Sequence, residues 1–216
     1  MKSFTWSIES PMDLRIRRFK SDDSENWDRL VYDSWNGTFL HSRRFLSYHG
    51  NRFEDFSFII EDENKKLLGV FPAAVDPIMT DRIISHPGIT YGGVVHNGLR
   101  GMEMLHVLEI IANICEREGM RALRYKAIPY IYHRVPAQDD LYALFRLGAK
   151  LYRSDLSATI DLLNRPRPSK GRRNGLKKAE RSGILIETDL SFLESYWVIL
   201  ERNLYEKFGV RPVHSP

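Results

Sequence analysis

The sequence predicts a mixed α/β fold in which helices flank a central sheet. Segments with strand-like alternation and segments with helical spacing follow one another in the order β-α-α-β-β-β-α-β-α-β between residues 13 and 161. Glycines and prolines separate these segments, as turns and helix ends require. The chain has 216 residues, which is enough for one or two domains with a buried core.

The first elements are an edge strand and two helices. Residues 13–19 alternate as an edge strand does. The next segment has Ser24 as its N-cap and acids in its first turn, and Gly37 closes it. His41 and Ser42 then begin a second short helix, with the serine as its cap.

The middle of the chain is rich in strand signals. Residues 56–62 and 65–75 predict two strands joined by a polar turn, which indicates a hairpin. Residues 82–95 are also β-rich, but Pro87 and three glycines interrupt them. We therefore expect one bent strand with an irregular start.

The clearest helix follows residue 101. Its apolar residues Met104, Leu108, Ile111 and Cys115 repeat at helical spacing, and Gly119 ends it. Cys115 is thereby expected to be a core residue.

The last elements before a break alternate again. Residues 121–127 predict a strand, residues 137–148 an acid-capped helix, and residues 150–162 a long strand. Pro166 and Pro168 then interrupt the pattern. We therefore place an N-terminal domain at residues 1–163 and a basic connector helix at residues 164–183.

Residues 184–216 resemble the start of the chain: a strand, a helix that begins at a serine, a glycine stop and a His-Ser pair. The offsets are 170 positions from Leu14 to Ile184, 172 from Gly37 to Gly209 and 173 from His41 to His214. These near-constant offsets predict a duplicated domain. The second copy would contain only its first strand and helix, and the sequence would be a fragment. Leu193, Trp197, Leu200 and Leu204 on that helix would need a partner.

Composition excludes several classes of protein. An apolar fraction of 43% and a charged fraction of 28% are typical of globular chains and exclude disorder. Cys115 is the single cysteine, which excludes an intrachain disulfide and a thiolate metal site. We find no signal peptide and no apolar segment near the ~20 residues of a membrane span. No catalytic triad, metal-ligand or Walker pattern is present. We expect a cytoplasmic protein without a metal.

The positive charge is concentrated in one segment. Residues 165–181 contain eight basic residues and one acid, a net charge of +7, whereas the whole chain carries +4. Arg173, Lys177 and Arg181 lie one helical turn apart, with Arg172 beside them, and could form a stripe that binds phosphate. The alternatives are a merely solvated helix face and a tRNA-binding surface.

Other candidate residues lie before the break. Tyr91 and Gly92, within "PGITYGGVV", and Lys126 and Tyr130, at the end of a strand, are candidate substrate contacts. A backbone bend explains the glycines equally well, and tyrosines are often packing residues. His133 is a further candidate general base, with loop packing as its alternative; the catalytic base stays unassigned.

The segments "SHPGITYGGVV", "DLYALFRLGAKLYRSDLSATIDL", "RRNGLKKAERSGI" and "KFGVRPVHS" resemble the duplicated branch of the GNAT acyltransferases. This bacterial branch contains the Fem-type aminoacyltransferases of peptidoglycan synthesis and related acetyltransferases of cell-surface polysaccharide clusters. The resemblance extends from about residue 12 to the end. It implies two GNAT-like mixed sheets flanked by helices, an acceptor site between the halves and a donor site in the second half.

One departure concerns the donor. GNAT enzymes that bind coenzyme A carry a glycine-rich loop whose backbone N–H groups hold the pyrophosphate. At that junction this chain has "HNGLRGME", in which the spacing of Gly98 and Gly101 does not match. We therefore expect acetyl-CoA or another acyl-CoA to bind to the other half, and this chain alone to be inactive.

These observations lead to three hypotheses. The first is an N-acyltransferase that acts on an amine of a phosphorylated sugar or cell-envelope precursor. The second is a Fem-type aminoacyltransferase that uses aminoacyl-tRNA. The third is a non-catalytic module that binds an anionic glycan or nucleic acid.

Overall fold

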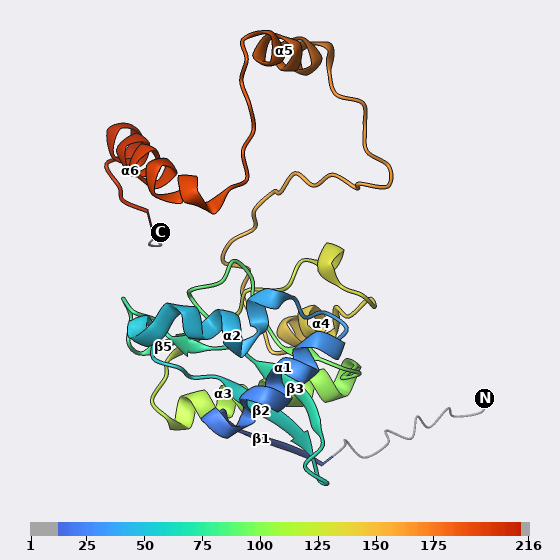
Figure 1. Ribbon diagram of the computed structural model, residues 1–216. Coiled ribbons are helices and arrows are strands. Elements are labelled where there is room, and N and C mark those ends of the chain that lie inside the picture. Colours follow the sequence, from blue (N-terminus) through green and yellow to red (C-terminus); the bar gives the residue numbers. More distant parts are fainter. Residues whose placement is uncertain (1–12, 213–216) are drawn as a thin grey trace, which may run out of the picture. The chain divides into compact units, whose positions relative to one another are not determined.

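The computed structural model describes residues 13–212 (Figure 1). His214 and Ser215, the second His-Ser pair, lie outside the described residues. In chain order the elements are β1 (Leu14–Arg18), η1 (Ser21–Asp23), α1 (Ser24–Asp33), η2 (Phe39–His41), α2 (Arg43–Leu46), η3 (Ser47–Arg52), β2 (Phe58–Asp62), β3 (Leu67–Phe71), β4 (Ala74–Val75), β5 (Arg82–Ile84), β6 (Val95–His96), α3 (Gly101–Arg117), β7 (Ala122–Arg124), η4 (Tyr130–Tyr132), α4 (Asp139–Arg146), α5 (Lys170–Arg181), η5 (Leu190–Phe192) and α6 (Leu193–Phe208).

The chain divides into two compact units. The first ends at Ser154 and the second begins at Asp155, earlier than the boundary predicted after residue 163. All seven of these strands belong to the first unit, whereas α5 and α6 belong to the second. The predicted mixed α/β class is confirmed for the first unit.

The larger sheet has the order β1-β2-β3-β6, and each neighbouring pair is antiparallel. The predicted hairpin is confirmed, because Ile59 of β2 pairs with Val70 of β3. The predicted edge strand is also confirmed, because β1 pairs only with β2.

A second sheet has the order β4-β5-β7, with β5 and β7 parallel. The single bent strand expected over residues 82–95 is therefore wrong: β5 lies in this sheet and β6 in the larger one. Pro87 has no N–H group to give to a ladder, and His86 has a positive φ of 47° that no strand accommodates. The intervening residues form a loop.

Alternation along β2 and β3 builds two cores on opposite faces of the larger sheet. Phe58 and Phe71 pack with the apolar face of α3, including Met104, Leu108, Ile111 and Cys115. Ile59 and Val70 pack on the other face with Trp27 of α1. The prediction that Cys115 is a core residue is confirmed.

Two local predictions for the first helix are wrong. Ser24 is the first helical residue rather than the cap, and its Oγ donates to the Ser21 carbonyl at 2.6 Å. The helix ends at Asp33, before Gly37. By contrast, Ser42 does cap α2, since its Oγ accepts from the Phe45 N–H at 3.2 Å.

Two segments that follow α4 lack the strands that their sequence predicts. Residues 150–162 form no strand, and neither do residues 184–188. A strand needs a hydrogen-bonded neighbour, and no ladder among the described residues includes either segment. The helical predictions hold, because α5 and α6 form at the expected positions. The duplication itself stays a prediction.

Candidate functional site

The loop between β5 and β6, residues 85–94, contains the Thr-Tyr-Gly-Gly sequence. A Cβ on Gly92 would lie 2.4 Å from the Ser85 carbonyl oxygen, and a Cβ on Gly93 would lie 2.7 Å from the Tyr125 hydroxyl. Gly93 also has a φ of +84°, which side chains rarely adopt. Close backbone packing therefore accounts for both glycines, including Gly92, a predicted substrate contact.

Tyr91 lies on this loop with its ring partly exposed. The ring stacks on Tyr132 with centroids 5.0 Å apart and planes at 22°. Its hydroxyl donates to Thr38 Oγ1 at 3.4 Å, a long contact. Burial raises the pKa of Tyr91, so the phenol stays protonated near neutral pH and can donate a hydrogen bond.

Tyr130 and Tyr132 lie at the two ends of η4, a short turn that follows Pro129. Their exposed fractions are 69% and 45%. We call Tyr91, Tyr130 and Tyr132 the aromatic surface. Exposed tyrosines present both a flat apolar face and a hydroxyl, a combination found at recognition sites.

His41 is a buried residue that packs against Tyr91 of the aromatic surface. Its side chain is fully buried, and its ring centroid lies 5.7 Å from that of Tyr91. Its Nδ1 accepts from the Thr38 N–H at 3.0 Å. Burial lowers the pKa of His41 to about 4, against smaller opposing effects of the Thr38 and Gly92 backbone. His41 is therefore neutral at physiological pH and acts by packing.

Lys126 lies beneath the same loop, but its ammonium faces the protein's own backbone. The Nζ donates to the His86 carbonyl at 2.8 Å and to the Ile89 carbonyl. Two of its three protons are thus engaged inside the loop. The structure brings Lys126 together with Tyr91 and Gly92, as a support of the loop that carries them.

His133 does not present a base at the surface. Its Nε2 lies 3.2 Å from the Ile128 carbonyl oxygen, which can only accept, so Nε2 carries the proton. Its Nδ1 is buried. Neither ring nitrogen is available to a substrate in this conformation.

The N-terminus of α3, which the sequence resemblance aligns with a pyrophosphate-binding loop, has carboxylates on its backbone donors. The Gly101 N–H donates to Asp139 Oδ1 at 2.7 Å, and the Arg100 N–H donates to Glu103 Oε2 at 3.0 Å. A helix N-terminus attracts one negative group through its free N–H groups. Since two acids already hold these donors, the residues present do not fit a pyrophosphate.

A second backbone donor, immediately before β6, is also engaged from within the protein. The Val94 N–H donates to the Tyr125 hydroxyl at 2.8 Å, and that hydroxyl donates to Asp140 Oδ2 at 2.8 Å. Burial raises the pKa of both groups. This buried network uses the Val94 N–H as a donor. The absence of a coenzyme A site in this unit stays a prediction.

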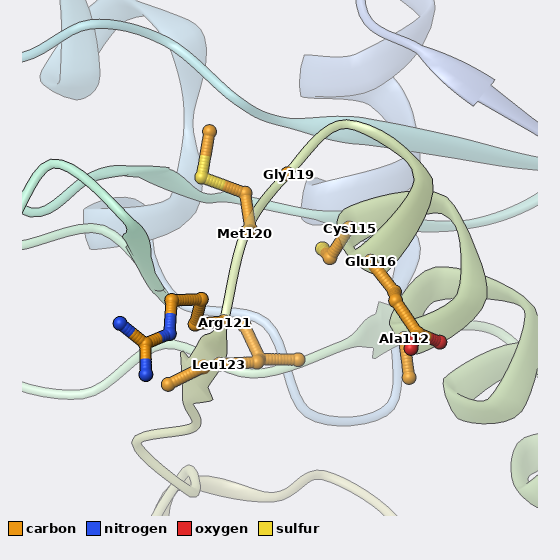
Figure 2. A pocket seen from close by; sticks show the side chains of 8 residues that line it. Ala112, Cys115, Glu116, Gly119, Met120, Arg121 and Leu123 are labelled. Carbon is orange, nitrogen blue, oxygen red and sulfur yellow. The ribbon is translucent and has the colours of Figure 1, made fainter.

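A cavity of about 550 Å³ lies between the end of α3 and β7, away from the aromatic surface. Figure 2 shows Cys115 and Glu116 on the helix side and Arg121 and Leu123 on the strand side. Burial raises the pKa of the Cys115 thiol to about 11, so it is protonated at neutral pH and is a poor nucleophile. No predicted site residue lines this cavity.

The basic stripe belongs to the second unit. Arg172, Arg173, Lys177 and Arg181 are all exposed on α5. Ser169 caps the helix, accepting from the Arg172 N–H at 3.3 Å. The eight predicted contact residues are therefore divided between two units, each of which is described by itself.

Sequence reasoning did not select Thr38, His41 or Tyr132 as site residues. The contact between Tyr91 and Thr38 joins residues 53 positions apart, and no local pattern encodes it. The exposed tyrosines of η4 had a weak signal in the Tyr-x-Tyr spacing after Pro129.

Among residues 13–212, no group of three or more His, Cys, Asp or Glu could hold a metal ion. Within the same range, no helix is long and apolar enough to cross a membrane.

Comparison with known proteins identifies no matching family model and no matching curated protein. Solved structures show distant similarity. One is described as "a putative phosphinothricin N-acetyltransferase": identity is 18%, the TM-score is 0.37, and the match covers 51% of this chain and 70% of that one. Another is a domain from Methanocaldococcus jannaschii DSM 2661, with 18% identity, a TM-score of 0.41, and coverage of 63% and 88%.

Proposed function

We propose that the chain belongs to a GNAT-type N-acyltransferase and that its first unit binds the acceptor, an amine-bearing sugar or cell-envelope precursor. The sequence motifs and the mixed α/β layout support the class. One observation supports the acceptor role in particular. The unit presents an accessible aromatic surface, while its own carboxylates occupy the α3 terminus that would hold the donor.

The proposed reaction class sets the requirements of the site. When bound, an acyl-CoA supplies an activated thioester carbonyl, which the acceptor amine attacks. The acceptor must lose a proton and be oriented, and the developing oxyanion needs hydrogen-bond donors. Of these tasks, the described residues of the first unit serve orientation, through stacking and through the Tyr91 hydroxyl. The acyl-CoA donor is proposed to bind elsewhere.

Binding of UDP-glucosamine, measured by titration calorimetry, tests the acceptor role. Tyr132→Ala should weaken binding about tenfold, the effect of losing roughly 1.4 kcal/mol. Tyr142→Ala is the matched control, because Tyr142 and Tyr132 are both 45% exposed and Tyr142 lies on α4. Equal effects of the two variants, or no binding at all, would exclude this surface as the acceptor site.

Turnover tests the division of roles. The purified chain, incubated with acetyl-CoA and an amino-sugar acceptor, should release no thiol above the uncatalysed rate. Robust release would show that this chain holds the donor, and the assignment of the first unit to acceptor binding would be withdrawn.

The second candidate function is aminoacyl transfer from tRNA, and the exposed basic helix α5 favours it. RNA binding through phosphate contacts weakens steeply as salt rises. A strict need for charged tRNA, together with such a salt slope, would select this function over an acyl-CoA-dependent one.

A further inference from the structure

The loop of residues 85–94 is hydrogen-bonded to both the side chain and the backbone of Lys126. The Lys126 Nζ donates to the carbonyls of His86 and Ile89, and the backbone of Lys126 contacts both ends of the loop. The Lys126 N–H donates to Ser85 Oγ at 2.7 Å, and the Lys126 carbonyl accepts from the Gly92 N–H at 2.9 Å. One residue thereby fixes the loop at four points.

The loop conformation needs such support because its backbone is strained. His86 has a φ of 47°, in the left-handed region that only a few per cent of non-glycine residues adopt. Strained residues persist only where surrounding contacts hold them. The 2.8 Å contact from the Lys126 ammonium to the His86 carbonyl lies at that strained residue.

Lys126 carries out this role without a carboxylate partner. Among residues 13–212, none of the ion pairs found includes Lys126. The charged and titratable groups around it are Arg124, the last residue of β7, and His86 on the loop, with His49, Arg43 and Asp55 beyond His86. Asp55 is engaged by Arg43 at 2.5 Å. The two carbonyls are therefore the groups that stabilise the ammonium.

We propose that Lys126 is a positioning residue whose ammonium holds the 85–94 loop in the conformation that stacks Tyr91 on Tyr132. Charge-assisted hydrogen bonds are roughly twice as strong as neutral ones. Loss of the proton therefore weakens the contacts to both carbonyls and loosens the loop. The role of Lys126 in acceptor binding rests on the proposed function, whereas its role in holding the loop does not.

Burial, together with Arg124, lowers the pKa of Lys126 to about 8. The sign follows from the direction of this shift. Below pH 8 the ammonium is present and the loop is held. Between pH 8 and the ordinary lysine pKa of 10.5, the folded protein has lost a proton that the unfolded chain still binds. Titration of Lys126 therefore increases the free energy of unfolding as pH rises through this window. Over the same window the loop becomes less tightly held. Loosening of the 85–94 loop without a fall in the free energy of unfolding distinguishes the effect of Lys126 from general alkaline unfolding.

Hydrogen–deuterium exchange of the ligand-free chain at pH 7 provides the first test. Lys126→Met should raise exchange of the loop amides, including Gly92, at least tenfold and leave the α3 amides protected. Lys66→Met, at an exposed lysine before β3, is the control and should change neither region. Wild-type exchange in the Lys126→Met loop would overturn the proposal.

An NMR titration tests it without relying on the stability of that variant. In the wild type, the Gly92 amide resonance should shift with a midpoint near pH 8. Lys126→Arg, which keeps its charge, should remove this midpoint. A wild-type Gly92 resonance that is flat from pH 7 to about pH 9.5, or an unchanged midpoint in Lys126→Arg, would contradict the proposal.

UDP-glucosamine titration separates this inference from the proposed function. If the loop responds as expected but the sugar does not bind, the acceptor proposal fails and the role of Lys126 in the loop stands. If the sugar binds with equal affinity to Lys126→Met and wild type, Lys126 does not position the acceptor site.

Discussion

The two units differ in side-chain burial, although both contain the helices that the sequence predicts. Both contain helices that are followed by a glycine with positive φ: α3 in the first unit, and α5 and α6 in the second. In the first unit α3 packs against the larger sheet, and its residues Met104 and Ile111 are completely buried. In the second unit, none of the described residues is buried. Helix signals thus determine local structure, whereas burial needs another element to pack against.

Acid should affect the two units most unequally, because among residues 13–212 the buried histidines all lie in the first unit. Burial lowers the pKa of His41, His86 and His96 to about 4. Between pH 4 and 6.5 the unfolded chain binds more protons than the folded one, so stability falls as pH falls through this window. Each histidine contributes about 3 kcal/mol across it. Urea denaturation from pH 7 to pH 4 measures the slope.

Two variants sharpen this test. His86→Asn should make the slope shallower, since asparagine tolerates the positive φ and does not titrate. His106→Gln, at a partly exposed position on α3, is the control and should leave it unchanged. An acid slope that is identical in both variants would contradict the role assigned to His86.

A tryptophan pair probes the cores directly. Trp27→Ala should lower the free energy of unfolding by about 3–5 kcal/mol, because Trp27 is fully buried and donates to the His41 carbonyl at 2.7 Å. Trp197→Ala, at the position of α6 that the predicted duplication would align with Trp27, should cost less than about 1 kcal/mol, since that side chain is only half-buried. Similar losses in urea denaturation would mean that the second unit has a core of its own.

Two glycines should respond with opposite signs. Gly93→Ala should destabilise the first unit by about 1–3 kcal/mol, because of the φ of +84° and the Tyr125 hydroxyl. Gly175→Ala in α5 meets nothing within 4 Å and should increase helix content, with a gain of up to about 1 kcal/mol. Thermal unfolding and far-ultraviolet circular dichroism measure these changes. Destabilisation by both substitutions would show that α5 packs against a neighbour.

The smallest expected effect concerns the basic stripe. Arg173→Ala should weaken binding of a phosphorylated sugar about tenfold, with the loss diminishing as salt rises. Arg15→Ala is the charge-matched control, because Arg15 is exposed on β1. Arg17 is unsuitable, since it pairs with Asp23 and Glu61 at 2.7 Å each. Equal calorimetric affinities for the two variants would identify the stripe as a solvated face.

Much of the first unit could be predicted from the sequence, where the periodicity was long or the turn unambiguous. The helical spacing from Met104 to Cys115 predicted α3 and its buried face, and the polar turn between β2 and β3 predicted the hairpin. The assignment of residues 82–95 to two sheets could not be predicted, because it depends on strand partners elsewhere in the chain: β5 pairs with β7, and β6 pairs with β3.

The roles of the candidate site residues stay predictions, and their arrangement could not be predicted. The sequence spacing did not show that Lys126 lies beside Gly92, or that the Lys126 ammonium faces backbone carbonyls. Nor could it show that Thr38 and His41 support Tyr91. The strands expected over residues 150–162 and 184–188 did not form, because alternation predicts a face to bury and does not supply a neighbouring strand.

The start of α3 offers a route for redesign. Asp139 and Glu103 act as internal substitutes for a bound anion, since each accepts from a backbone N–H near the helix terminus. Exchanging both for their amides would keep the side-chain shape and remove two negative charges. The scaffold would then present an electropositive helix end close to the buried Tyr125–Asp140 network, a starting point for engineering affinity for an anionic ligand into this unit.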